Sequence, residues 1–178
     1  MRISLLLITL LAISFTSKAQ FGGETGMGNV WHYPGQVGLE LGLKRSSIGW
    51  NYSISASQYL KSNSFIKGNL FYDNGNFQRV GIDSFGLNAI YFYSPYSIAQ
   101  TVFFNIGGGL TGNYDMVKNF WPQTKKKFNY GAIGAIEVEA AVADYLMITT
   151  TGQQRFLKND TYGRARFEIG FGVKYLIN

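Results

Sequence analysis

The chain has 178 residues, of which 46% are hydrophobic and 16% aromatic, and its formal net charge is +6. It contains no cysteine, which excludes disulfides, thiolate metal sites and a lipidated N-terminal cysteine. The length predicts one domain, and the mild basic excess indicates no partner until its location is known.

The N-terminus predicts a cleaved signal peptide over residues 1–19. Arg2 precedes an apolar run from Ile3 to Phe15, and Ser17-Lys18-Ala19 offers a small-x-small cleavage site. The run is too short to cross a bilayer, although a buried helix or an anchor is the alternative. We expect residues 20–35 to form a flexible segment and residues 36–178 to form the folded domain.

Eight segments of this domain alternate between apolar residues and small or polar ones. Period two over about ten residues predicts β-strands that face two different environments. The third and seventh segments alternate less cleanly than the others. In chain order the segments are QVGLELGLK (36–44), IGWNYSISAS (48–57), SFIKGNLFYD (64–73), DSFGLNAIYFY (83–93), TVFFNIGGGLTG (101–112), AIGAIEVEAAV (132–142), YLMITTTGQQRF (145–156) and RARFEIGFGVKYLIN (164–178).

The connections alternate between short and long. The expected tight turns are at residues 60–63, 94–97 and 143–144, and the expected long loops are 74–81, 113–129 and 157–162. Short turns at one end and long loops at the other are typical of outer-membrane barrels. The three prolines, Pro34, Pro95 and Pro122, all fall outside the proposed strands, as a hydrogen-bonded ladder requires.

Side-chain volume decides which face points outward. An eight-stranded barrel has room for side chains and at most one small ligand, and the apolar faces carry too many large groups to fit inside. An apolar exterior is stable only in lipid. The sequence therefore predicts an all-β fold, an eight-stranded antiparallel up-and-down transmembrane β-barrel in the outer membrane. The alternative is a soluble lipocalin-like barrel with an apolar cavity.

The faces predicted to point inward carry charges of both signs. Because buried charges need partners, we expect a salt-bridged interior instead of an open pore. Glu137 and Glu139 also resemble a carboxylate pair for acid–base or metal chemistry, but ion pairing is the favoured interpretation, and we expect no metal or cofactor. The predicted network is Glu40, Lys44, Glu137, Glu139, Arg155, Arg166, Glu168 and Lys174.

Two further features outside the strands carry candidate chemistry. His32 is the single histidine; it could be the base of a barrel hydrolase, but we interpret it as part of an interfacial cluster with Trp31 and Tyr33. A basic and aromatic patch lies on the longest expected loop, where we expect contact with lipopolysaccharide phosphates or acidic partner proteins, and no direct nucleic-acid contact. The patch is Trp121, Lys125, Lys126, Lys127 and Phe128.

Several stretches together resemble one family. PGQVGLELGL, FFNIGGGLTGNYD, the region GAIGAIEVEAAVADYLMITTTGQQRFL and the ending GVKYLIN are similar to the TraO proteins of Bacteroidetes conjugative transposons. The likeness covers most of residues 34–178 and includes Glu137, Glu139 and Arg155. The family tends to have a Ser-Asp-Arg turn before its seventh strand, and this chain keeps only Asp144 of it.

The resemblance implies a component of the conjugative transfer apparatus in the outer membrane. We therefore expect a non-enzymatic barrel that acts as a scaffold or partner-binding protein, in contact with outer-membrane lipid and other conjugation proteins. The alternative is a general outer-membrane barrel, a small-ligand carrier or a lipid-modifying enzyme unrelated to conjugation.

Overall fold

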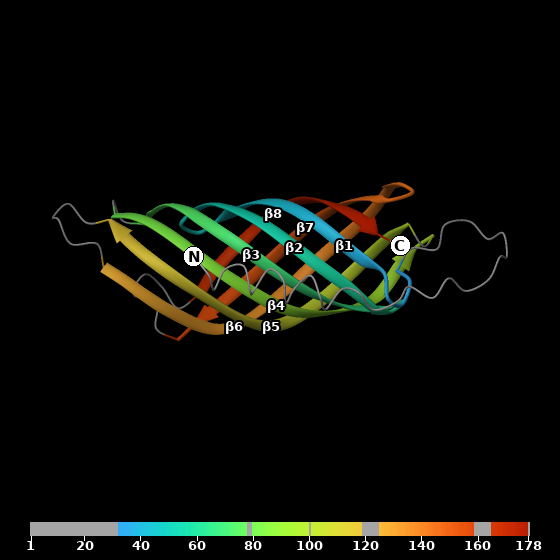
Figure 1. Cartoon of the computed structure of the whole chain (residues 1–178), viewed down its shortest axis with the longest axis horizontal. Coiled ribbons are helices and arrows are strands. Elements are labelled where there is room, and N and C mark those ends of the chain that lie inside the picture. The colour runs from blue at the N-terminus through green and yellow to red at the C-terminus, as the bar shows by residue number, and fades with distance from the viewer. Residues whose placement is uncertain (1–31, 78–79, 100, 119–124, 159–164, 178) are drawn as a thin grey trace, which may run out of the picture.

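A single closed β-barrel makes up the computed structural model of the chain (Figure 1). The structure describes residues 32–77, 80–99, 101–118, 125–158 and 165–177. Every strand is antiparallel to the next, and β8 pairs with β1 from Val37↔Ile177 to Ser46↔Glu168. The strands are β1 Val37–Ser46, β2 Gly49–Lys61, β3 Ser64–Phe77, β4 Val80–Ile98, β5 Val102–Lys118, β6 Lys125–Ala143, β7 Leu146–Leu157 and β8 Ala165–Ile177. The predicted eight-stranded up-and-down topology is confirmed.

The strands on one side of the barrel are longer than the alternation predicted. β3 and β4 leave only residues 78–79 between them, so the expected loop 74–81 is wrong. The expected loop 113–129 is also too long, because β5 continues to Lys118 and β6 begins at Lys125. In β6 the added residues Lys125–Lys127 are polar at successive positions, and a strand without a contrast between its faces has no period-two signal.

Pro95 lies inside a strand, contrary to the prediction. β4 runs on to Ile98 where a tight turn at residues 94–97 was expected. The pairing of β4 with β5 shifts register between Tyr93 and Tyr96. Such an irregularity accommodates a residue that has no N–H to donate to the ladder.

The outer surface of the barrel is a continuous apolar wall. Its exposed side chains include Leu41 (66%), Leu110 (71%) and Phe171 (70%), from β1, β5 and β8. Side chains at the alternate positions of the same strands are buried inside. The predicted assignment of the two faces therefore holds around the barrel. No helix among the described residues is long and apolar enough to cross a membrane.

An apolar cluster fills the end of the interior where the tight turns lie. Tyr59, Phe65, Phe92 and Met147 are all fully buried there, beside Phe103 and Leu176. The rings of Phe65 and Phe92 stack with their centroids 4.9 Å apart. We call Tyr59, Phe65, Phe92, Phe103, Met147 and Leu176 the aromatic plug. It closes the turn end of the barrel, while polar and charged side chains occupy much of the remaining interior.

Candidate functional site: the charged interior

Two lysines and three glutamates form the first cluster inside the barrel. Lys67 Nζ lies 2.7 Å from Glu40 Oε2 and 2.6 Å from Glu137 Oε2. Lys174 contacts Glu139 closely and lies 3.5 Å from Glu137 Oε1 and 3.8 Å from Glu40 Oε2. Each lysine thus bridges carboxylates from different strands. Removing either cation would leave buried negative charge without compensation.

Glu139 connects this cluster to the aromatic plug. Its Oε2 lies 2.7 Å from His32 Nε2, and its Oε1 accepts a 3.2 Å hydrogen bond from the Tyr59 hydroxyl. The His32 ring is fully buried and stacks on Phe103 with centroids 3.7 Å apart. Residue 32 has a φ of 65°, a left-handed conformation that is uncommon for a residue other than glycine.

The position of His32 differs from the interfacial cluster that the sequence predicted. It precedes β1, as expected, but it lies inside the barrel and not in an interfacial cluster; Trp31 lies outside the described residues, and Tyr33 is 45% exposed. The segment that follows is held by backbone hydrogen bonds, including Gly35 N to Tyr59 O at 2.7 Å. Within residues 32–35, the described part of the expected flexible segment, His32 is buried and Gly35 is hydrogen-bonded to β2, while residues 33–35 are exposed.

A second cluster centres on Arg155. Its NH2 group lies 2.6 Å from Asp73 Oδ2 and also contacts Glu168 closely. The guanidinium lies over the Phe71 ring, 4.2 Å from the centroid. Lys44 is linked to this cluster through a glutamine: it donates a 3.5 Å hydrogen bond to Gln153, which in turn donates to Glu168.

A third cluster lies around Asp115. Arg166 NH2 is 2.5 Å from Asp115 Oδ2, and the amides of Asn113 and Asn129 donate to the two carboxylate oxygens at 2.6 and 2.7 Å. Both oxygens of this carboxylate, which is 1% exposed, therefore accept hydrogen bonds. A buried charge that is both paired and hydrogen-bonded carries a smaller penalty than one that is only paired.

Some of these contacts join strands on opposite sides of the barrel, while others join neighbouring strands. Asp73 is on β3 and Arg155 on β7; Tyr59 is on β2 and Glu139 on β6. In a closed sheet of eight strands, elements four apart lie on opposite sides. Side chains that meet across the diameter leave no open channel at those levels. The interior is a packed, cross-linked core.

The structure distributes the eight residues predicted for the interior among these three clusters. All of them lie inside and take part in the contacts described above, Lys44 by way of Gln153. Sequence reasoning missed Lys67, Asp73 and Asp115. Lys67 and Asp73 occupy inward positions of the weakly alternating third segment, and Asp115 fell in a region interpreted as loop.

The interior charges are close to balance among the described residues. Six carboxylates accompany five lysine and arginine side chains, leaving aside Asp83, which pairs with the exposed Lys118. The carboxylates are Glu40, Asp73, Asp115, Glu137, Glu139 and Glu168, and the cations are Lys44, Lys67, Arg155, Arg166 and Lys174. No group of three or more potential ligands able to hold a metal occurs in the described part of the chain. The carboxylates instead serve as partners of lysine, arginine and hydrogen-bond donors.

The predicted basic and aromatic patch is only partly a loop feature. Trp121 lies outside the described residues, and Lys125 begins β6, so the assignment of Lys125–Phe128 to a loop is wrong. Lys126, Lys127 and Phe128 are exposed on the extended part of this strand. The polar run KKK has no apolar alternation to mark it as strand, although it pairs with Asp115–Val117 of β5.

Comparison with known proteins finds similarity of structure alone. No family model and no curated protein matches the chain. Neisserial surface protein A superposes with a TM-score of 0.64 at 15% identity, covering 79% of this chain and 95% of that one. The N-terminal β-barrel domain of Pseudomonas aeruginosa OprF gives 0.59 at 14% identity, with 80% and 97% covered. Pseudomonas aeruginosa OprG gives 0.57 at 8% identity, with 81% and 97% covered.

The shared fold and the surface of the barrel together decide where the chain resides. The superposed proteins are outer-membrane barrels, and at these identities the likeness concerns the fold. The continuous apolar exterior needs hydrocarbon around it, because water would leave tens of large apolar side chains solvated. The chain is an eight-stranded outer-membrane β-barrel.

Proposed function

We propose that this barrel is a non-enzymatic component of a conjugative DNA-transfer apparatus, in which it acts as an outer-membrane scaffold or partner-binding protein. The observation that carries the scaffold role is the cross-linked interior. Ion pairs between opposite strands, such as Asp73 with Arg155, favour a rigid body over a conduit. Partners would then meet the barrel at its rims and exposed strand extensions.

The assignment to conjugation is supported by the resemblance to TraO proteins. Three residues that carry this resemblance, Glu137, Glu139 and Arg155, are also three of the residues that cross-link the interior. In this proposal these three residues belong to the family pattern because a rigid barrel needs their ion pairs.

A non-enzymatic role is also supported by the environment of His32. A general base must lie within hydrogen-bonding distance of the group from which it removes a proton, either the substrate or a nucleophile. The His32 ring is fully buried between Phe103, Tyr59 and Glu139, inside the turn end of the barrel. A lipid substrate at the outer wall has no access to this position.

Deletion of the gene in a donor cell tests the role. We expect DNA transfer and assembly of the transfer machinery to fall, with recovery on complementation by the wild-type chain. Outer-membrane permeability is the control, because a general envelope defect would lower transfer indirectly. Unchanged transfer and unchanged assembly in the deletion strain would refute the proposal. Release of fatty acid from lipid A by the purified barrel, lost in His32→Ala, would favour an enzyme instead.

A further inference from the structure

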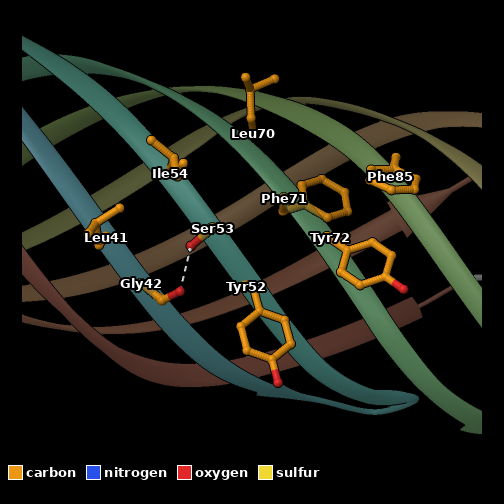
Figure 2. Close-up of a pocket in the computed structure, with 9 residues that line it drawn as sticks. All are labelled: Leu41, Gly42, Tyr52, Ser53, Ile54, Leu70, Phe71, Tyr72 and Phe85. Atoms are coloured by element: carbon orange, nitrogen blue, oxygen red, sulfur yellow. Dashed lines mark hydrogen bonds between the residues drawn. The ribbon is translucent and has the colours of Figure 1, made fainter.

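A groove on the outer wall crosses strands β1 to β4. It has a volume of about 480 Å³, and its walls are the side chains of Leu41, Tyr52, Ile54, Leu70, Tyr72 and Phe85 (Figure 2). The inward-facing residues Gly42, Ser53 and Phe71 underlie it. The volume falls within the range of sites for small organic ligands. This groove is open to the surroundings of the barrel and separate from the charged interior.

The chemistry of the wall changes in order along these strands. The register places Leu41, Ile54 and Leu70 opposite one another on β1, β2 and β3. Two residues nearer the β1–β2 hairpin, Tyr52 and Tyr72 are paired. Two residues farther still, the paired positions are Arg45, Trp50, Asn74 and Asp83 on β1 to β4. The wall thus passes from an aliphatic row to a row rich in tyrosine and then to a polar row with charges of both signs.

Polar groups lie next to the groove on the side of the longer connections. The Tyr72 hydroxyl, which belongs to the groove wall, donates to Asp83 Oδ1 at 3.1 Å, and Asn74 Nδ2 donates to the same oxygen at 2.8 Å. Lys118 Nζ lies 2.5 Å from Asp83 Oδ2, yet its side chain remains 66% exposed. On the other flank, exposed Arg45 lies over the Trp50 ring, 5.3 Å from its centroid. The exposed cation Lys118 is therefore linked through Asp83 to Tyr72 of the groove wall.

The order of aliphatic, aromatic and cationic groups matches one lipid molecule in the membrane. Aromatic side chains favour the interface, and lysine or arginine beyond them favours phosphate. The polar end of the groove is on the side of the longer connections, which face outward from the cell in barrels of this type. We propose that the groove binds an acyl chain of lipopolysaccharide, with a lipid A phosphate held by Lys118.

The inference depends on the outer-membrane location and not on a role in conjugation, so its test uses the purified barrel. Native mass spectrometry in a mild detergent measures retention of added lipopolysaccharide. Ile54→Trp fills the groove, and we expect retention to fall about tenfold, the effect of losing a few buried methylene contacts. Ile136→Trp is the matched control, because Ile136 is equally exposed on β6 (64% against 62%) and lies outside the groove. Equal retention by the two variants overturns the groove assignment.

Substitution of Lys118 by an uncharged residue tests the proposed contact with phosphate. We expect Lys118→Gln to lower retention about fivefold, and Lys61→Gln, an exposed lysine at the turn end of β2, to leave it unchanged. Removing the phosphates from lipid A should abolish the difference between Lys118→Gln and the wild type. A heat-dependent mobility shift confirms that each variant is folded. Equal or stronger retention of a glycerophospholipid by the wild type would overturn the assignment to lipopolysaccharide.

Discussion

The outer and inner faces of this barrel are held by different kinds of interaction, although they alternate along the same strands. The outer face presents large apolar side chains such as Ile54 and Leu110 to lipid, where one apolar group replaces another at little cost. The inner face is built from specific pairs, such as Arg155 with Asp73, that meet across the diameter. The exterior therefore requires only apolar residues at its outward positions, whereas the interior requires particular residues that can pair with one another.

The largest expected effect comes from removing a cation that crosses the interior. Arg155→Met leaves the buried carboxylates of Asp73 and Glu168 without their shared partner. We expect the free energy of unfolding in lipid vesicles, measured by urea titration, to fall by about 3–5 kcal/mol. Arg45→Met, which removes an exposed arginine, should cost less than about 1 kcal/mol. Equal effects would mean that the interior pairs contribute no more than surface charges.

A charge on the outer wall should have the next largest effect. Leu110 is 71% exposed and lies near the middle of the apolar stretch of β5, so Leu110→Arg places a cation in hydrocarbon. We expect it to reduce the unfolding free energy in vesicles by about 2–4 kcal/mol, and Ile177→Arg at the turn end by about 0–1 kcal/mol. Recovery of folded Leu110→Arg in the soluble periplasmic fraction would instead indicate that this wall faces water.

The same difference explains how much of the fold could be predicted from the sequence. Lipid and core impose opposite chemistry, so residues such as Phe171 and Gly172 alternate cleanly and reveal both the strand and its faces. Where a strand leaves the lipid, as at Lys125–Lys127, both faces are polar and the signal disappears. The topology was therefore predictable, while the strand ends were not.

The sequence predicted that the interior would be charged and salt-bridged, but not which residues would form each ion pair. The period assigns Glu139 and Lys174 to the inner face, and the need of a buried charge for a partner predicts pairing. Which residues pair depends on the stagger of the strands in the closed sheet, because the stagger sets which inward side chains of β2 and β6 lie at the same level. No local sequence pattern encodes that stagger. The burial of His32 was not predictable, because His32 enters the barrel from a segment outside the strands, where no alternation assigns a residue to a face.

The smallest expected effect comes from adding a single methyl group at one of two glycines, one tightly surrounded and the other with open space around it. A Cβ at inward-facing Gly86 would lie 2.2 Å from Cζ of Phe71 and 2.6 Å from the Gly112 carbonyl oxygen, whereas a Cβ at Gly134 would meet nothing within 4 Å. We expect Gly86→Ala to lower the unfolding free energy by about 1–3 kcal/mol and Gly134→Ala to change it by less than about 0.5 kcal/mol.

The Phe71 ring lies against the Arg155 guanidinium, so a ring displaced by the new methyl group would also weaken that guanidinium's contacts. Gly86→Ala should therefore cost less in an Arg155→Met background than in the wild type, and strict additivity of the two changes would show that the ring and the ion pair are independent.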